Sequence, residues 1–448
     1  MTKLNQKIFK AYDIRGIYPE ELNEDTTYLI GQAFAKMSGA KKVVVGRDMR
    51  LGSPELAAKL IQGLLSQGVD VDDIGMMPID AVYFAIGKYK YDGGIMVTAS
   101  HNPKEYNGFK MATLDKKGLY IIRGVEIYDY LAGKTFPPAD TKGRLKKKNL
   151  TKKYIDHVLS FVEVSKIRPF KIVIDAGNGM AGKIAPLLFK QLPCQLIPLN
   201  FDLDGNFPGH PSNPLLPESQ IQIKETVVNE KADLGVIMDG DTDRMFFITE
   251  KGDFIRADTS LIILAKYFLE KYPGAGIAYN AICSKAVPQR IKEWGGQPIR
   301  SKVGFANVAQ AMKDHSGVMS GEVSAHYAFK DNYYADSGFI GFLILLMLIS
   351  KEDKPLSQIV EGLNPYFRAD EINIEVHDIP GIIDKIKKKY SDAKQDELDG
   401  VTIEYTDWWV NVRPSNTEPL LRITIEGNTR EIMEQKQEEV VNYIKSIA

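Results

Sequence analysis

The sequence has very little cysteine, no long hydrophobic run and no excess of charge of either sign. Its two cysteines, Cys194 and Cys283, cannot build a disulfide framework, and they lack the CxxC or Cys/His spacing of a metal site. We therefore expect a cytoplasmic protein. Basic and acidic side chains number 57 and 58, so they nearly cancel. No general basic field is available to hold nucleic acid, and we expect no nucleic-acid partner.

The longest apolar stretch, Gly338–Ile349, has 12 residues, whereas a membrane-spanning helix needs about 20. It predicts a buried core helix and no membrane span. The segment Met1–Gly16 lacks the apolar region of a signal peptide. Hydrophobic residues make up 44% and charged residues 26% of the 448 residues, which is typical of a globular protein of about three or four domains and excludes a disordered chain.

A strand–loop–helix pattern recurs along the chain. Its strands are expected at Lys42–Val45, Ile172–Asp175 and Gly276–Tyr279, at intervals of roughly 105 to 130 residues. Strands that alternate with helices favour parallel sheets. The sequence thus predicts three similar mixed α/β domains in series. Beyond Asn364–Ala369 the pattern changes to four strands and two helices, which predicts a smaller C-terminal α+β domain.

We place the four domains at residues 1–152, 153–255, 256–367 and 368–448. The first boundary follows from the segment Lys142–Lys153, in which seven of 12 residues are basic. Such a charge run is typical of a solvated connector. A nucleic-acid patch is the alternative interpretation, but it would need interleaved aromatic residues and a basic surround, and the segment has neither.

The segment Thr98–Pro103 places a serine after the expected strand Gly94–Thr98. Ligand sites of open α/β sheets lie at the carboxyl ends of strands, so Ser100 is a candidate functional residue. The neighbouring His101 also suggests a hydrolase. However, the GxSxG pattern is absent, and sequence neighbours in a loop rarely face each other.

Asp239, Asp241 and Asp243 follow the expected strand Leu234–Met238. Three carboxylates so close together repel one another unless a cation lies among them. Their oxygen donors suit Mg²⁺ or Mn²⁺. An EF-hand is excluded because Arg244 stands where that loop needs glycine. The phosphatase pattern DxDx[TV] is excluded because Asp243 stands where it needs threonine or valine.

Three further loops carry chemistry-bearing residues. Gly177–Gly182 fits G-x-G-x-x-G and Asp202 follows 20 residues later, which suggests a nicotinamide-dependent oxidoreductase; a tight structural turn is the other interpretation. Gly321–His326 presents three hydrogen-bonding side chains, as a polyhydroxylated ligand would require. Arg413–Pro419 combines an arginine with hydroxyl and amide groups and is a candidate phosphate-binding loop.

Taken together, these loops and their order give the chain a resemblance to the α-D-phosphohexomutase superfamily, in particular its bacterial phosphomannomutase/phosphoglucomutase branch. The resemblance begins at Phe9–Gly16 and ends at Arg413–Pro419, so it covers nearly the full length. It implies four domains around a central cleft, each of which contributes one loop.

The resemblance also implies roles for individual residues. Ser100 would carry the phosphoryl group, and Asp239, Asp241 and Asp243 would hold Mg²⁺ with the serine phosphate as a further ligand. Residues implied to line the reacting centre are Tyr12, Arg15, His101, Lys110 and Arg244. Residues implied to bind substrate are Tyr12, Lys302, Glu322, Ser324, His326, Arg413, Ser415, Asn416 and Thr417. Either Lys110 or His101 would transfer the sugar hydroxyl proton.

The implied reaction interconverts hexose 6-phosphate and hexose 1-phosphate through a phosphoserine and a hexose 1,6-bisphosphate, which also serves as activator. Mannose ranks first and glucose second. Phosphoglucosamine mutase is an alternative, although such members usually carry a different residue at the position of Val323. Two departures bear on sugar contacts: Phe305 stands where the family often has histidine, and Ala325 stands where glycine is usual.

A non-catalytic sugar-phosphate-binding protein is a third class of function. It would keep the phosphate loop and lose either the serine or the three aspartates, and this chain keeps both. The sequence leaves open whether the protein is a monomer or a dimer.

Overall fold

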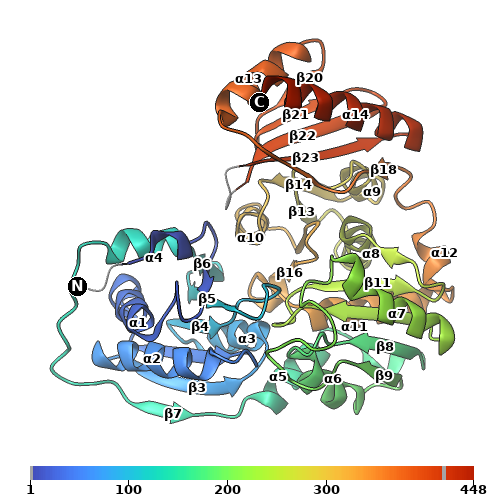
Figure 1. Ribbon diagram of the computed structural model, residues 1–448. Coiled ribbons are helices and arrows are strands. Elements are labelled where there is room, and N and C mark those ends of the chain that lie inside the picture. Colours follow the sequence, from blue (N-terminus) through green and yellow to red (C-terminus); the bar gives the residue numbers. More distant parts are fainter. Residues whose placement is uncertain (1–3, 416–419) are drawn as a thin grey trace.

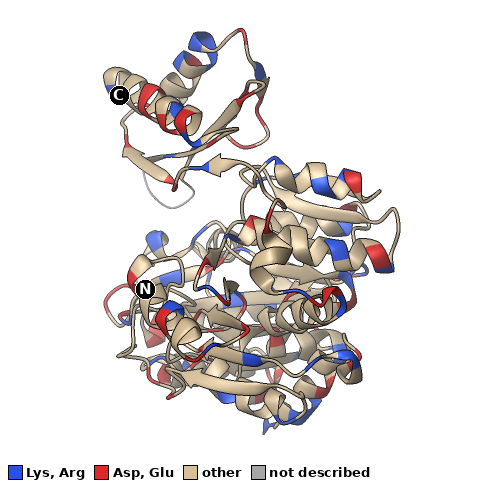
Figure 2. Ribbon diagram, turned by 90° about the vertical axis from the view of Figure 1, so that its right-hand side faces the viewer, with Lys and Arg blue, Asp and Glu red and all other residues tan. Residues whose placement is uncertain are grey.

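The computed structural model describes residues 4–415 and 420–448, and these form four sheets in chain order (Figure 1). In Figure 1 the first and second sheets lie side by side in the lower part of the molecule, the third lies above them, and the fourth lies at the top with α13 and α14. Ribbon segments coloured blue for Lys and Arg and red for Asp and Glu alternate along the whole chain in Figure 2, in keeping with the balanced composition.

The first sheet runs in the order β1-β5-β4-β2-β3-β7, with β6 paired to β5. Its strands are β1 (Ile14–Ile17), β2 (Lys42–Arg47), β3 (Asp70–Met76), β4 (Gly93–Val97), β5 (Tyr106–Leu114), β6 (Leu119–Ile122) and β7 (Leu145–Lys147). The accompanying helices are α1 (Glu24–Ser38), α2 (Ser53–Ser66), α3 (Ile79–Tyr89) and α4 (Gly124–Leu131). Asn23 caps α1 by accepting a hydrogen bond from the Thr26 amide, and Gly39 ends it in a left-handed conformation.

The second sheet has the order β12-β11-β10-β8-β9 and the third the order β14-β13-β15-β16-β17. The second comprises β8 (Lys171–Asp175), β9 (Gln195–Leu199), β10 (Leu234–Met238), β11 (Met245–Thr249) and β12 (Phe254–Ile255), with α5 (Thr151–Leu159), α6 (Ala181–Phe189) and α7 (Pro217–Asn229). The third comprises β13 (Gly276–Asn280), β14 (Gln297–Ser301), β15 (Met319–Gly321), β16 (Tyr327–Phe329) and β17 (Ala335–Asp336), with α8 (Ala257–Lys271), α9 (Ala286–Glu293), α10 (Phe305–Asp314), α11 (Gly338–Glu352) and α12 (Leu356–Val360).

These three sheets repeat one layout, which confirms the predicted series of similar α/β domains. In each, a central strand (β2, β8 or β13) pairs in parallel with two neighbours. One of those neighbours (β4, β10 or β15) then turns back into an antiparallel strand (β5, β11 or β16). The connection at that turn is the serine, aspartate or Gly321–His326 loop. The repeat therefore places all three loops at the carboxyl ends of equivalent strands.

The fourth sheet is antiparallel throughout and runs β18-β23-β22-β21-β20, with β19 paired to β23. Its strands are β18 (Phe367–Arg368), β19 (Ile372–Glu375), β20 (Lys394–Asp396), β21 (Val401–Glu404), β22 (Trp408–Pro414) and β23 (Leu420–Gly427), with helices α13 (Ile379–Lys389) and α14 (Arg430–Ile447). The smaller α+β domain is thus confirmed.

The hydrophobic cores follow the same division. One continuous cluster of buried side chains runs through the first three domains and includes the almost fully buried α11. The predicted core helix is therefore confirmed, and it extends to Glu352. A separate cluster fills the fourth domain. Across the residues that the structure describes, no helix is long and apolar enough to cross a membrane.

Two of the three sequence-based boundaries cut through an element of the structure. The segment Lys142–Lys153 is not simply a solvated connector, because β7 within it pairs in parallel with β3, and α5 begins at Thr151. A domain boundary after residue 152 would divide α5. The boundary after residue 367 would divide β18, which pairs with β23 of the fourth sheet. The boundary after residue 255 falls between β12 and α8 and stays a prediction.

Candidate active site

The serine loop connects β4 to β5 and buries Ser100 completely. Ser100 has a φ of +52°, in the left-handed region that L-residues rarely adopt. Its hydroxyl donates a hydrogen bond of 2.5 Å to Asp239 Oδ2, and its Oγ lies 3.1 Å from His101 Nδ1. The Ser100 amide donates to Thr98 Oγ1. The backbone is thus held in an unusual conformation that aims the hydroxyl at the aspartate loop.

Arg50 fixes the shape of this loop. Its guanidinium, which is 1% exposed, donates to four main-chain carbonyls: those of Ser100 (2.8 Å), Asn102 (2.5 Å), Pro103 (2.8 Å) and Tyr106 (3.0 Å). A planar group with five donors is well suited to hold several carbonyls at once. The loop is therefore positioned by a buried arginine that lies on a different strand-end loop.

Arg50 and the serine loop are in turn held in place by Asp48, Phe207 and Ser212. Asp48 Oδ2 lies 3.4 Å from Arg50 Nε as its counter-ion, and the ring of Phe207 lies 4.9 Å from the guanidinium carbon. Ser212 donates a second hydrogen bond, of 3.1 Å, to the Ser100 carbonyl.

A cavity of about 620 Å³ opens beside the serine loop and is bounded on its other side by residues 206–216. That volume suits a small ligand.

The aspartate loop, between β10 and β11, brings three buried carboxylates together. Asp239, Asp241 and Asp243 each offer an oxygen, and these atoms all lie within 4.8 Å of one another. Burial and the charges of the other two raise the pKa of Asp239 to about 7. Thr242, a β-branched residue, has a φ of +66°, so the loop holds a strained conformation at its centre.

These carboxylates fit a divalent cation. Asp241 Oδ1 is buried and lacks a hydrogen-bond partner within residues 4–415 and 420–448. Such an orphaned oxygen is explained by a bound ion or water. Hard oxygen donors are those that Mg²⁺ prefers. The three aspartates therefore form a site whose charge and donor set suit a hard divalent cation.

Two of the predicted cationic side chains, Lys110 and Arg244, pair directly with these carboxylates. Lys110 Nζ is 2.9 Å from Asp241 Oδ2 and also pairs with Asp243. Burial would lower the pKa of Lys110, but these two aspartates raise it. Arg244 Nε lies 3.7 Å from Asp239 Oδ2.

Arg15 approaches the centre from the serine-loop side. It pairs with Asp13 at 2.8 Å and donates to the Ala99 carbonyl and to the Asn102 side chain. Beside these cations, burial and the charges of Arg244 and Arg15 lower the pKa of His101 well below its usual value. The structure thus brings the five predicted residues Arg15, Ser100, His101, Lys110 and Arg244 to one place.

The loop between β15 and β16, called the sugar loop below after the role that the family resemblance implies, carries Glu322, Ser324 and His326. These side chains form hydrogen bonds with one another. Glu322 Oε1 accepts hydrogen bonds from Ser324 and from His326 (3.1 Å), and His326 Nδ1 lies 2.8 Å from Ser324 Oγ. Burial would raise the pKa of Glu322, but the bonds from His326 and Ser324 lower it to about 2. Ala325, where the family usually has glycine, has a φ of +65°. The left-handed backbone explains that preference.

Phe305, where the family often has histidine, forms an aromatic stack. Its ring lies 5.2 Å from that of His326 and 6.0 Å from that of Tyr12. The Tyr12 hydroxyl donates to the Val303 carbonyl at 2.7 Å. Burial, Glu322 and Asp399 raise the pKa of Tyr12 to about 12. Tyr12 thus joins the first domain to the third, and Lys302, beside Val303, is exposed.

The predicted phosphate loop lies on the fourth domain. Arg413, 4% exposed, stands near the end of β22 and pairs with Glu371 at 2.9 Å. Arg422 pairs with the other oxygen of Glu371. The Ser415 amide donates to the Leu420 carbonyl. Asn416 and Thr417 lie outside the described residues.

The Gly177–Gly182 loop packs against the aspartate loop. A Cβ at Gly179 would lie 2.7 Å from the Cα of Gly240, and the Met180 amide donates to the Gly240 carbonyl. A Cβ at Gly182 would lie 2.2 Å from the Phe201 carbonyl oxygen. Close backbone packing thus explains these glycines without a dinucleotide, and the tight-turn interpretation is the better one.

Sequence reasoning missed Arg50, Asp48 and Asp336 as neighbours of the centre, whereas it had named Phe305 as bearing on sugar contacts. A signal for the first two existed. Asp48 and Arg50 follow β2, which is parallel to β4, so both strand ends reach the same edge of the sheet as Ser100. Asp336 left no comparable signal, since its placement near Asp243 depends on how separate domains pack.

Four chain segments match family descriptions in series. Residues 6–138, 152–252 and 256–366 match alpha/beta/alpha domains I, II and III of phosphoglucomutase/phosphomannomutase, and residues 371–442 match its C-terminal domain. A phosphomannomutase of Escherichia coli K12 is 39% identical over 430 residues, 94% of each chain. A phosphomannomutase/phosphoglucomutase of Pseudomonas aeruginosa is 34% identical over 99% of this chain and 96% of its own.

Solved structures agree. A phosphoglucomutase/phosphomannomutase family protein of Burkholderia thailandensis has a TM-score of 0.88 at 33% identity and covers 99% of this chain and 98% of its own. The fold and the four loops define a class of multidomain α/β proteins, the α-D-phosphohexomutase superfamily. Within it, the chain belongs to the phosphoglucomutase/phosphomannomutase family.

Proposed function

We propose that the protein is a phosphohexomutase that interconverts hexose 6-phosphates and hexose 1-phosphates, with Ser100 as the phosphoryl carrier. One observation carries the proposal: the fully buried Ser100 hydroxyl lies 2.5 Å from Asp239 Oδ2, inside a cluster of three carboxylates and three cationic side chains. A hydroxyl in an ordinary surface turn would have no such surroundings. Family membership supports the same reaction class.

The charges suit phosphoryl transfer. A phosphoserine carries about −1.5 to −2 charges near neutral pH, and further negative charge spreads over oxygens during transfer. Arg15, Lys110 and Arg244 surround the serine and can offset that charge as it develops.

The three aspartates Asp239, Asp241 and Asp243 would hold Mg²⁺, with the phosphate on Ser100 as a further ligand. When bound, the ion supplies positive charge next to the transferring group. Of the two candidates for proton transfer, His101 has a ring nitrogen within 3.1 Å of Ser100 Oγ, whereas Lys110 is engaged by two carboxylates. This distance supports His101 for proton exchange with the Ser100 hydroxyl, and either His101 or Lys110 would accept the sugar hydroxyl proton.

The substrate must lie between the serine and the fourth domain. Glu322 and Ser324 would bind sugar hydroxyls, with His326, Tyr12 and Lys302 beside them. Arg413 and Ser415, with Asn416 and Thr417, would hold the phosphate that is not reacting. Since the same enzyme must return the second phosphate to Ser100, a hexose 1,6-bisphosphate would turn around in the cleft and would also act as activator.

We rank mannose phosphate first and glucose phosphate second, in line with the names of the relatives. Phosphoglucosamine mutase activity is the alternative within the family. We further propose that the enzyme acts in the cytoplasm on small sugar phosphates, without a nucleic-acid or membrane partner.

The proposal is tested with a coupled assay that compares mannose, glucose and glucosamine 1-phosphates with a trace of the matching 1,6-bisphosphate. Intact-mass measurement should show one phosphate on the active enzyme and none on Ser100→Ala, and the variant should lose several orders of magnitude in kcat. Full activity of Ser100→Ala would refute the carrier role. No turnover of any of the three sugars by wild type would refute the function.

A further inference from the structure

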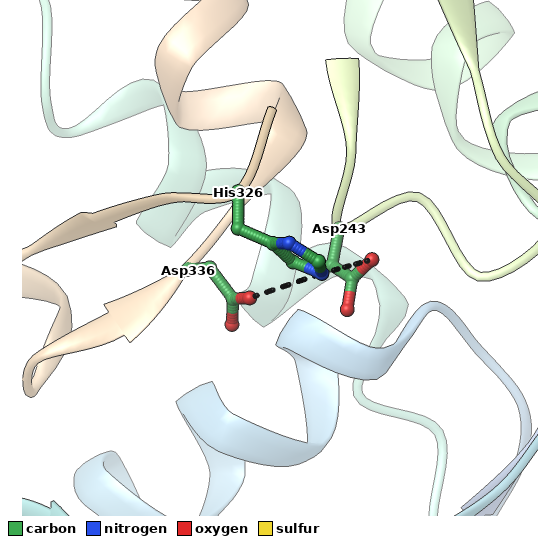
Figure 3. A group of neighbouring side chains, drawn as sticks. All are labelled: Asp243, His326 and Asp336. Carbon is green, nitrogen blue, oxygen red and sulfur yellow. Dashed lines mark ion pairs between the residues drawn. The ribbon is translucent and has the colours of Figure 1, made fainter. Parts of the chain in front are cut away.

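Three buried side chains from two different domains meet behind the aspartate loop. Asp243 comes from that loop, His326 from the chain just before β16, and Asp336 from β17 (Figure 3). They are 1%, 5% and 5% exposed. His326 Nε2 lies 3.4 Å from Asp243 Oδ1 and 4.0 Å from Asp336 Oδ2. The imidazole edge thus faces one carboxylate on each side.

The three facing atoms are paired by charge but form no well-aligned hydrogen bond. Among the described parts of the chain, nothing hydrogen-bonds to Asp243 Oδ1, His326 Nε2 or Asp336 Oδ2, although each atom is buried. Buried polar atoms are almost always satisfied, by protein, by water or by an ion. A small, mainly apolar cavity of about 10 Å³ lies on one side of the cluster and is bordered by Glu322, His326 and Asp336 but not by Asp243. That is room for about one atom of water size.

The orientation of the imidazole is fixed from its other side. His326 Nδ1 lies 2.8 Å from Ser324 Oγ and 3.1 Å from Glu322 Oε1, and Phe305 stacks on the ring. A carboxylate on the far nitrogen is the arrangement that orients metal-binding histidines in proteins. Nε2 is therefore presented to Asp243 and Asp336 without any rearrangement of the ring.

We propose that Asp243, His326 and Asp336 form a second divalent-cation site, suited to Zn²⁺ or Co²⁺ rather than Mg²⁺. One imidazole and two carboxylates are a donor set for zinc, whereas Mg²⁺ prefers oxygen alone. With ligand bonds of about 2.0–2.1 Å, neighbouring donors of a tetrahedral zinc lie about 3.3–3.4 Å apart. The spacing between His326 Nε2 and Asp243 Oδ1 matches this at 3.4 Å, and a small rotation of Asp336 would complete it.

Asp243 belongs to both clusters, because it is also one of the three aspartates of the first site. An ion on His326 and Asp336 would withdraw Asp243 from that site and immobilise the side chains of the sugar loop. Occupation of the second site should therefore inhibit the enzyme. This consequence, unlike the binding itself, rests on the proposed function.

The binding is tested on the full chain with Co²⁺ in excess Mg²⁺. A four- or five-coordinate Co²⁺ with an imidazole ligand absorbs visible light far more strongly than an octahedral Co²⁺ with oxygen ligands alone. Wild type should show the strong band with one Co²⁺ per chain, and His326→Gln should lose it. Only a weak octahedral spectrum from wild type would overturn the proposal, whatever the variants do.

Zinc affinity gives a second readout, by equilibrium dialysis with elemental analysis. Asp336→Ala should weaken retention of Zn²⁺ by at least about 10-fold, and Asp336→Asn provides a second variant if the first fails to fold. His157→Gln is the matched control, since that imidazole bonds Asn332 and lies outside the cluster. Equal Zn²⁺ retention by wild type and both Asp336 variants would overturn the proposal.

The inhibitory consequence is measured separately. Micromolar Zn²⁺ should slow the Mg²⁺-supported mutase reaction, and Asp336→Asn should need at least about 10-fold more Zn²⁺ for the same fractional inhibition. Inhibition that is equal in wild type and variant would overturn this part. Because the spectrum and the dialysis need no turnover, they hold or fail independently of the proposed activity.

Discussion

The reacting centre and the phosphate loop are built in opposite ways. Ser100, Asp239 and Lys110 are at most 3% exposed and are interlocked by hydrogen bonds and ion pairs. Their strands pack into a hydrophobic cluster that continues through three domains and into a second cluster within the first domain. Arg413, in contrast, belongs to a domain with its own core, and its charge partner Glu371 lies in that same domain.

The connections to the fourth domain are polar. The Val303 amide donates to Asp399 at 2.7 Å, the Lys285 amide donates to Glu426 at 3.1 Å, and Arg368 pairs with Asp258 at 3.1 Å. The proposed reacting groups are thus positioned by continuous packing, whereas the residues proposed to bind the remote phosphate belong to a domain with its own core (Figure 1). Mutations in the first region should chiefly lower kcat, and mutations in the second should change KM as well.

Apart from loss of the Ser100 hydroxyl itself, the largest effect should come from Arg50, which holds the serine loop through main-chain carbonyls. Arg50→Ala removes the donor to four carbonyls and leaves Asp48 buried without its counter-ion. Displacement of Ser100 by about 1 Å is expected to cost about 100-fold in kcat, and the unpaired buried charge about 3–5 kcal/mol of stability. Steady-state kinetics and denaturant unfolding measure the two losses.

Arg50→Lys and Arg47→Lys separate positioning from simple charge. A lysine at position 50 keeps the charge but cannot reach four carbonyls, so kcat should recover only partly while KM stays near the wild-type value. Arg47 donates to the Asp48 carbonyl and to no serine-loop carbonyl among the described residues, and its lysine variant should behave as wild type. Full kcat in Arg50→Ala would show that the packed domains position Ser100 unaided.

A substantial effect, dependent on pH, should come from the junction of the first three domains. Asp80 on α3 accepts hydrogen bonds from Tyr154 of α5 and from Ser337, which caps α11. Burial raises its pKa to about 7, with Asp336 and Asp243 contributing. A raised carboxyl pKa favours the protonated form in the folded state. Its stabilisation is complete below the unfolded value of about 3.9 and is lost as pH rises through 7.

The unfolding free energy of wild type should therefore fall relative to that of Asp80→Asn between pH 4 and 7. The amide cannot titrate, so the difference reports this one group. The change should be at most about 4 kcal/mol, since each pKa unit corresponds to about 1.4 kcal/mol. Urea titrations of both proteins across this pH range, at constant Mg²⁺, measure it. A constant difference would mean that Asp80 stays ionised in the junction.

The parts of the site that were predicted are those fixed by local chemistry. Ser100 and the three aspartates follow buried strands, and a strand end predicts its own loop position. Arg50 could have been identified by the same strand-end argument, because it follows β2 and β2 is the neighbour of β4. Asp80 and Asp336 were not, since their importance comes from contacts across domains. No periodicity in one chain tells which buried carboxylates will meet.

A moderate effect should come from the phosphate loop. Arg413→Ala removes a charged donor, so KM should rise and kcat should fall, together costing about 1.5–3 kcal/mol in kcat/KM. Dependence on added 1,6-bisphosphate should increase as the intermediate escapes more often. Steady-state kinetics and a rapid-quench count of released bisphosphate measure these changes. Unchanged KM, kcat and escape would make this loop a structural turn.

Glu371→Gln sharpens the same comparison. Glu371 forms an ion pair with the Arg413 guanidinium at 2.9 Å. A phosphate bound to Arg413 would therefore share the guanidinium with Glu371 or displace Glu371. The neutral amide should compete less and leave more positive charge for the ligand, which predicts a lower KM. A KM higher than that of wild type would instead mean that Glu371 is needed to orient Arg413.

The smallest effect should come from Ala325, which has one of three non-glycine left-handed backbones in the loops of the reacting centre. Ser100, Thr242 and Ala325 have φ values of +52°, +66° and +65°. The first serves the proposed chemistry through its side chain, and the Thr242 hydroxyl donates to the Asp241 carbonyl. Ala325 has only a buried methyl group, so it is the one position where glycine can be tested without removing a polar group.

Ala325→Gly changes the free energy of unfolding through three contributions of similar size. Relief of the left-handed strain favours the variant by about 1–2 kcal/mol. The lost methyl burial costs about 0.8 kcal/mol, and the greater freedom of unfolded glycine costs about 0.4–1 kcal/mol. The sum lies within about 1 kcal/mol of zero, so denaturant unfolding should find nearly wild-type stability and kinetics an unchanged kcat. Ala325→Val should be clearly less stable, because a β-branched side chain tolerates this backbone worst. Equal stability of the glycine and valine variants would mean that the sugar loop relaxes out of the left-handed conformation. In that case the loop would lack the rigidity that distinguishes the reacting centre from the phosphate loop.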